Sequence, residues 1–324
     1  MLILKAEYQY LMNESLKNSK YGLNRGNLKM IALFCMALDH IAAIVLTAWQ
    51  NTLIKDTPLY IFDNFLIIFL RLIGRLAFPI FCFFIVEGLI HTRNVYKYAF
   101  RLLLLALLSE IPFDLAHTAK LIDFNDQNVF WTLFLGLVAI YCIEGLYRKF
   151  KLKKPALYLL IFIIALLADT VAYTINCDYG AFGVSTIIII YLVGRKEYFM
   201  PFVINGLALI NFYFVLINLK GIDYGENADL APIAFAVYIT FVLTVSSVAL
   251  FFTKFIKNKN SRKMYAACVT LSAMSFDEAA ALVNVLLMKY YNGEKGRKIG
   301  WIFYLFYPLH FLILACICKL LGLY

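Results

Sequence analysis

The sequence has little charge for its length. Asp, Glu, Lys and Arg make up 15% of its 324 residues, whereas about a quarter of a soluble protein is charged. Hydrophobic residues make up 63%. No soluble core can bury so large an apolar share, so a water-soluble domain, a disordered chain and a fibrous repeat are excluded. The apolar residues must lie in lipid.

The motifs of several common enzyme classes are also absent. The seven cysteines form no CxxC pair and no Cys-His ligand spacing, so we expect core thiols and no metal site. There is no GxSxG elbow, HExxH pair or Rossmann glycine fingerprint, which excludes the usual hydrolases, metalloproteases and dinucleotide enzymes. The net charge of +10 comes from short basic clusters rather than one continuous stripe, so we expect no nucleic-acid partner.

Long apolar stretches are what the sequence has instead. They cover residues 28–50, 64–90, 95–117, 127–147, 155–176, 179–194, 199–218, 230–254, 265–288 and 299–321. Each is near the length of a membrane helix and is continuously apolar, where a barrel strand would alternate over about ten residues. The predicted fold class is all-α: a polytopic integral membrane protein of about ten transmembrane helices. Residues 1–27 form a polar arm, and residues 28–324 a single multi-pass domain.

The basic residues predict an orientation for these helices. Lys and Arg accumulate in every second connection, and cytoplasmic loops are the ones that retain them, so we expect a cytoplasmic N-terminus. The alternation fails after the ninth stretch, 265–288, which is followed by more Lys and Arg and carries Asp277 and Glu278 near its middle. Two interpretations remain: a re-entrant or broken segment that returns to the cytoplasm, or a full span that breaks the charge rule.

Ionisable side chains lie inside four of the predicted spans, where a charge is costly unless it is paired or hydrated. They are Asp39 and His40 in the first span, Arg71 and Arg75 in the second, Glu110 and Asp114 in the third, and His310 in the last. Their depths run from the bilayer centre to the outer leaflet, so we expect them to line one water-accessible cavity. The alternative is that Asp39 with Arg71 or Arg75, and Glu110 with the other arginine, form ion pairs that lock helices together. Histidine favours the cavity, because its pKa near neutrality suits proton transfer.

Two cationic segments are predicted on the inner side. Glu87 is followed by His91, Arg93, Lys97 and Arg101, which either reflect topology or bind a phosphorylated cytosolic donor. Residues 292–298 combine two glycines with Lys and Arg, as phosphate-binding turns do, but they are not a GxxxxGK[ST] loop. On the outer side, Asp178 precedes Tyr179 and Gly180, where it can cap a helix.

A series of short motifs resembles one known family. They are Leu28–Ala32 with Asp39-His40, Arg71–Pro79, Glu87-Gly88 with His91–Arg93, Ser109–Asp114, Asn128–Phe130, Asp178–Gly180, Asn292-Gly293 and Phe303–His310. In this order, from about residue 28 to the end of the chain, they are similar to the TraX family, which includes the conjugative pilin N-acetyltransferase. That family is related to the broader group of transmembrane acyltransferases.

The resemblance implies an acyl-CoA-dependent N- or O-acetyltransferase of the bacterial cytoplasmic (inner) membrane. Acetyl-CoA is the co-substrate, and the acceptor is a peptide, a pilin or a glycan. On this hypothesis His40, oriented by Asp39, deprotonates the acceptor, with His310 as the reserve base. Arg75, with Arg71, stabilises the oxyanion or holds Glu110.

The remaining predicted site residues fall into two sets. The expected CoA-binding residues are Arg93, Asn292, Gly293, Lys295 and Arg297. The expected supporting residues are Arg71, Glu87, Asp114, Asn128, Asp178, Tyr179 and Tyr307. Two other functions stay open: a proton-coupled transporter with Asp39, Glu110 and Asp114 as its relay, and a non-catalytic membrane assembly factor. The sequence names neither the acceptor, the acyl length nor the oligomeric state.

Overall fold

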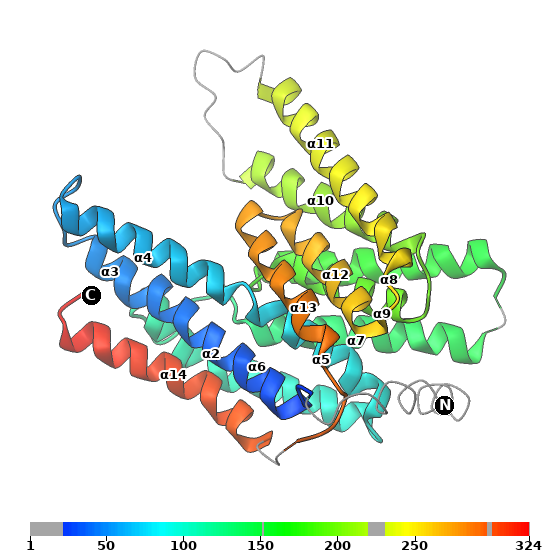
Figure 1. Ribbon diagram of the computed structural model, residues 1–324, viewed down its shortest axis with the longest axis horizontal. Helices are drawn as coiled ribbons and strands as arrows, with labels where there is room; N and C mark the ends of the chain where they lie inside the picture. Colours follow the sequence, from blue (N-terminus) through cyan, green and yellow to red (C-terminus); the bar gives the residue numbers. More distant parts are fainter. Residues whose placement is uncertain (1–21, 151, 220–230, 297–299, 324) are drawn as a thin grey trace.

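The computed structural model describes residues 22–150, 152–219, 231–296 and 300–323 (Figure 1). In these residues the regular structure is helical apart from two isolated β-bridges, so the all-α prediction is confirmed. The helices are α2 (Arg25–His40), α3 (Thr47–Gln50), α4 (Pro58–Gly74), α5 (Ala77–His91), α6 (Val95–Thr118), α7 (Val129–Lys149), α8 (Lys154–Thr174), α9 (Gly180–Gly194), α10 (Met200–Leu219), α11 (Ala231–Phe252), α12 (Lys259–Ser272), α13 (Val283–Lys289) and α14 (Gly300–Leu320). Most of the predicted N-terminal arm lies outside the described residues.

Six helical segments in the described part of the chain are long and apolar enough to cross a membrane. They are Arg25–Gln50, Pro58–His91, Val129–Lys149, Lys154–Thr174, Val237–Phe255 and Ile302–Leu320. Gly180–Gly194 and Met200–Asn211 are shorter apolar helices. By length and composition the structure therefore supports a multi-pass membrane protein, with fewer unbroken spans than the ten that the sequence predicts.

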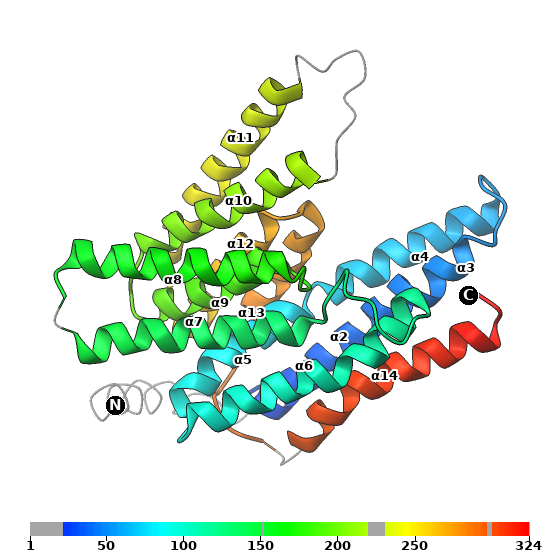
Figure 2. The ribbon, with the colours of Figure 1, turned by 180° about the vertical axis from the view of Figure 1, so that it is seen from behind.

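Helix α9 is the centre of the larger core. Every residue from Ala181 to Val193 is buried, because α7, α8, α10 and α12 all pack against this helix (Figure 2). A helix that is covered on all sides needs no polar face, which explains why its sequence is apolar all round.

A second group of helices, α2, α4, α6 and α14, lies beside this core and forms the other end of the molecule (Figure 1). Its buried cluster brings Met36 of α2 against Phe113 of α6 and Phe311 of α14. The first and the last helix of the described chain, α2 and α14, therefore both belong to this group.

Two of the long apolar segments are interrupted at residues that the sequence singles out. The segment Pro58–His91 breaks into α4 and α5 at Arg75 and Leu76. In the first segment, α2 ends at His40 and is followed by a π-helical stretch, Ile41–Leu46. Breaks and π-helical turns within membrane segments are typical of binding sites, because they free backbone groups and re-aim side chains.

The ninth stretch is a helical hairpin. Helix α12 ends at Ser272, a 3₁₀ segment Phe276–Leu282 follows, and α13 runs back alongside α12. The Ser261 hydroxyl donates to the carbonyl of Val285 at 3.2 Å, so the start of α12 lies beside α13. Next to α13, Tyr291 pairs with Leu23, two residues before α2 begins. Of the two interpretations of this stretch, the structure has the broken one, which returns to the end of the molecule where it began.

Candidate active site

A cavity of about 390 Å³ lies where α2, α6 and the α4–α5 break meet the connections before α7 and before α9. We call it the histidine cavity, because His40 lines it. Most of the ionisable residues predicted within spans line it, together with several predicted supporting residues. They are Asp39, His40, Arg71, Arg75, Asp114, Asp178, Tyr179 and Tyr307. The structure thus brings residues from distant parts of the sequence to one hollow, although the predicted members Glu110 and His310 are not among its lining residues.

His40 and His310 form a hydrogen-bonded pair. Nδ1 of His40 lies 2.7 Å from Nε2 of His310, and the two rings are nearly parallel. Nδ1 of His310 lies 3.0 Å from the carbonyl oxygen of Phe306, which can only accept a hydrogen bond. Neutral His310 therefore carries its proton on Nδ1 and accepts through Nε2, so His40 must donate from Nδ1. The lone pair of His40 is then on Nε2, free to accept a proton.

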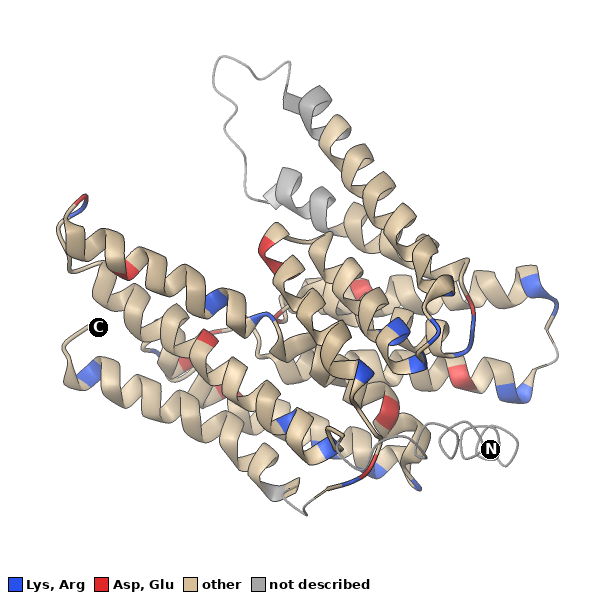
Figure 3. Ribbon diagram, in the orientation of Figure 1, with Lys and Arg blue, Asp and Glu red and all other residues tan. Residues whose placement is uncertain are grey.

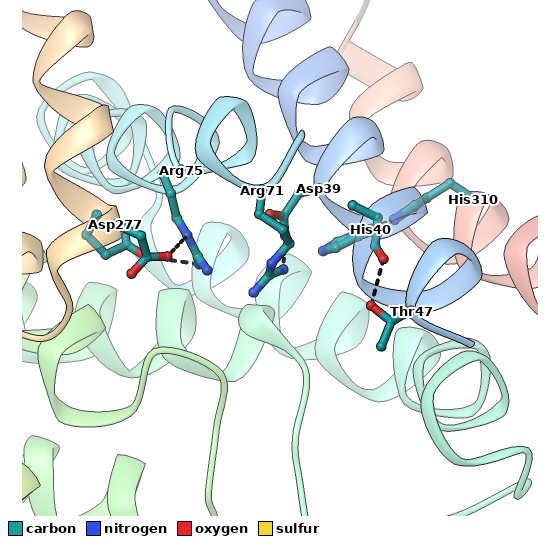
Figure 4. Close-up of polar contacts among 9 residues, drawn as sticks. Asp39, His40, Thr47, Arg71, Arg75, Asp277 and His310 are labelled. Atoms are coloured by element: carbon teal, nitrogen blue, oxygen red, sulfur yellow. Dashed lines mark hydrogen bonds and ion pairs between the residues drawn. The ribbon is translucent and has the colours of Figure 1, made fainter. Parts of the chain in front are cut away.

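Asp39 does not orient His40, and that prediction is wrong. Its Oδ2 accepts a hydrogen bond from Nη1 of Arg71 at 2.7 Å (Figure 4). Consecutive residues on a helix point in different directions, so Asp39 faces α4 while His40 faces α14. Gly74 permits the close approach of α2 and α4, because a Cβ there would lie 2.2 Å from Oδ1 of Asp39.

Arg75 is held by the α12–α13 hairpin. Its Nε lies 2.7 Å from Oδ2 of Asp277, and its Nη1 lies 3.0 Å from Oε1 of the buried Glu278 (Figure 4). The prediction that an arginine holds Glu110 is wrong. The sequence singles out Asp277 and Glu278 only as a topological anomaly, although their position in an apolar stretch is the signal of a buried partner.

Glu110 connects helices rather than lining the cavity. Its carboxylate accepts hydrogen bonds from Nε1 of Trp131 at 2.9 Å and from the side chain of Asn128, which also caps α7. Asp114, one turn later on α6, does line the cavity and accepts from the backbone N–H of Asp123 at 2.8 Å. These bonds fix the connection between α6 and α7 at the rim.

Two further cavities lie toward the start of α2. One, which we call the cationic cavity, has a volume of about 400 Å³. It is lined by five cationic side chains, Arg25, Lys29, Arg93, Lys97 and Arg101, with Glu87 and His91. The other, of about 170 Å³, is mostly apolar. It shares Lys29, Phe84 and Tyr98 with the cationic cavity, and Met36, Phe81, Val129 and Tyr307 with the histidine cavity. The three cavities therefore adjoin one another in series.

Comparison with known proteins gives the family. The sequence model of a family described as TraX protein matches residues 24–318. The chain belongs to the TraX family. A relative from Dichelobacter nodosus, named as the probable fimbrial assembly protein FimC, serogroup H1, is 28% identical over 304 residues, which are 90% of this chain and 94% of that protein. No solved structure matches the chain.

The predicted CoA-binding residues of this TraX family member lie at or near the cationic cavity. Arg93 lines it. Asn292, Gly293 and Lys295 precede α14, and the backbone of this segment bonds to Leu23 and Arg25, so it borders the cavity through Arg25. Arg297 lies outside the described residues.

This TraX family member also has a buried ion pair next to the cationic cavity. Glu87 forms a buried ion pair with Lys263 of α12 at 2.9 Å, beneath the cationic cavity. In the described part of the chain, no group of three or more His, Cys, Asp or Glu side chains is placed to hold a metal ion.

His117 belongs to the site although no sequence motif singles it out. It lines the histidine cavity, and its ring lies 5.4 Å from that of Phe311, on which His40 also stacks at 4.6 Å. The available signal was its position three residues after Asp114 in the same predicted span, which places both on one face of a helix.

Proposed function

We propose that the protein is a membrane-embedded acyltransferase that moves an acetyl group from acetyl-CoA to an amine or hydroxyl. The observation that carries this proposal is the series of three cavities, cationic, apolar and then histidine-lined, which matches the order of chemical groups along an acyl-CoA. Membership of the TraX family supports it, because the conjugative pilin N-acetyltransferase belongs to the same family.

The cationic cavity suits the phosphates of the donor. Five Lys and Arg side chains can form charge-assisted hydrogen bonds with them. Lys29 and His40 are eleven residues apart on α2, which is about 16 Å at the rise of an α-helix. An extended pantetheine arm is of comparable length. It would pass through the apolar cavity and bring the thioester to His40.

His40 is the base in this mechanism. Its Nε2 accepts the proton of the acceptor as the nucleophile attacks the thioester carbonyl. The Nδ1 proton stays on the hydrogen bond to His310, which holds the ring and stabilises the imidazolium that forms. Collapse of the tetrahedral intermediate releases the thiolate of CoA, which takes the proton back from His40.

The acceptor would enter from the opposite side of the cavity. Asp114, Asp123, Asp126 and Asp178 line that rim and favour a cationic group. Lys120 and Asn125 donate to Asp123 and hold its pKa below its usual value, so it is a carboxylate at neutral pH. An acidic rim favours the ammonium of a peptide or pilin over the hydroxyl of a glycan, and the name of the Dichelobacter nodosus relative, a fimbrial assembly protein, agrees with such an acceptor.

We further propose that the cationic cavity faces the cytoplasm, with the N-terminus, in a bacterial inner membrane. Lys and Arg lie where α7 ends and α8 begins, and again at the start of α2 and before α12 (Figure 3). Because the ninth stretch is a hairpin, both of its ends lie on one side of the membrane. The Lys and Arg residues that follow it are then on the cytoplasmic side, as the positive-inside rule requires.

The test uses the full chain, purified and reconstituted into liposomes. With acetyl-CoA and an acceptor peptide, the proposal predicts release of free CoA and acetylation of the peptide. A parallel reaction offers a glycan in place of the peptide, and acetylation of the glycan would identify transfer to a hydroxyl. Proton flux in liposomes that contain no CoA would favour a transporter instead. The absence of both transfer and flux would leave a non-catalytic assembly factor.

A further inference from the structure

Tyr179 has an unusual backbone conformation. Its φ of 61° and ψ of −6° place it in the left-handed region at the start of α9. Bulky side chains rarely adopt this conformation, because Cβ crowds the neighbouring carbonyl. Such outliers persist where the surrounding structure enforces them, and they concentrate at functional sites.

The ring of Tyr179 is held by stacking on a neighbouring aromatic ring. It stacks on Phe78 with a centroid distance of 3.7 Å and an angle of 7° between the planes. In the first turn of α9, a Cβ added to Gly183 would lie 2.9 Å from Cβ of Tyr179 and 3.0 Å from Cζ of Phe78, so glycine at this position leaves room for the stacked pair. Tyr179 lines the histidine cavity. Its hydroxyl has no hydrogen-bond partner among the residues that the structure describes, so this donor is unused.

The two arginines of the cavity are less available than Tyr179. Arg71 is paired with Asp39, and Arg75 with Asp277 and Glu278. Three carboxylates thus face two guanidinium groups, and a new anion beside them would be repelled as well as attracted. A neutral donor with a fixed direction avoids this repulsion.

We propose that the hydroxyl of Tyr179 donates the hydrogen bond that stabilises the oxyanion of the tetrahedral intermediate. The proposal rests on the proposed acetyl transfer. As the acceptor nitrogen bonds to the thioester carbon, the C=O electron pair moves onto oxygen, and the Tyr179 O–H lies against that oxygen without giving up its proton. When C=O reforms, the C–S bond breaks and the thiolate leaves with the proton that His40 holds.

The test is the variant Tyr179→Phe, which keeps the aromatic ring and removes only the hydroxyl. The proposal predicts that kcat for acetyl transfer falls about 10²–10³-fold, as on removal of other oxyanion donors. The Kd for CoA and the thermal midpoint in detergent stay within error of the wild type, because ring stacking is retained. A kcat within threefold of the wild type would overturn the proposal. So would a fall in kcat that is matched by loss of CoA binding or of thermal stability.

Tyr173→Phe is the matched control. Tyr173 lies in the last turn of α8, outside the lining of the cavity, so the same chemical change there should leave kcat unchanged. His40→Ala separates the two levels of the proposal. Suppose that the wild type transfers acetyl, that His40→Ala does not, and that Tyr179→Phe transfers acetyl at the full rate. In that case only the role of Tyr179 fails. If the wild type transfers nothing, the proposed function itself fails.

Discussion

At the scale of the residue, the decisive feature is the asymmetry of the histidine pair. The carbonyl of Phe306 fixes the tautomer of His310, and His310 in turn fixes that of His40. The two imidazole rings therefore have different roles, although they lie at a similar depth. Nε2 of His40 has the free lone pair, whereas Nε2 of His310 accepts the hydrogen bond from His40.

This asymmetry predicts a ranking of variants. His40→Ala should lower kcat about 10²–10⁴-fold, since the general base is lost. His310→Gln keeps a side-chain oxygen that can accept from His40, so it should retain more activity than His310→Ala. Steady-state transfer rates at saturating acetyl-CoA measure the ranking. A His310→Ala variant that is more damaged than His40→Ala would mean that the roles are reversed.

At the scale of the element, the site depends on how closely helices approach. Helix α2 reaches α4 only because residue 74 is glycine, and the α12–α13 hairpin reaches the α4–α5 break to bring Asp277 and Glu278 to Arg75. The cavity is therefore assembled by elements that the sequence shows only as interruptions in apolar runs.

Gly74→Ala tests this packing. The added Cβ would lie 2.2–2.5 Å from side-chain atoms of Asp39, including its Cβ, so the helices must separate. We expect a loss of about 1–3 kcal/mol of stability, typical of overpacking, and weaker transfer activity.

Gly145→Ala in α7 is the control for that variant, because an added Cβ there meets nothing within 4 Å. Thermal unfolding in detergent should show a lower midpoint for Gly74→Ala alone. Equal midpoints for both variants would show that α2 and α4 do not approach each other closely enough at Gly74 for an added Cβ to clash.

At the scale of the whole molecule, the cavities form a route from the cationic end to the acidic rim. Arg93→Gln should weaken donor binding and raise KM for acetyl-CoA about tenfold, with little change in kcat. The reason is that it removes one charge-assisted hydrogen bond to a phosphate, and such a bond is worth about 1.5–3 kcal/mol. Lys154→Gln, a cation at the start of α8 that lines none of these cavities, should leave KM unchanged. Equal effects of the two substitutions would indicate general charge attraction rather than a donor site.

The sequence predicts the helical class and the shared cavity, because apolar length and intramembrane charge are one-dimensional signals. It offers Asp39 with Arg71 or Arg75 as one possible ion pair, which the structure forms with Arg71, but it cannot decide among the possible pairs. Asp39 and His40 are neighbours in sequence yet face different helices, and Glu110 finds Asn128 and Trp131 rather than an arginine. Arg75 meets acids some two hundred residues later in the chain, a partnership that only the hairpin creates.

The most direct test of the account follows a labelled acetyl group through the reconstituted protein. Liposomes are given acetyl-CoA that carries ¹³C in its acetyl group, together with an acceptor peptide, and the peptide is analysed by mass spectrometry. The account predicts a labelled acetyl group on the peptide, one free CoA for each acetyl transferred, and neither with His40→Ala. An unlabelled peptide with the wild type, or an equally labelled one with His40→Ala, would contradict it.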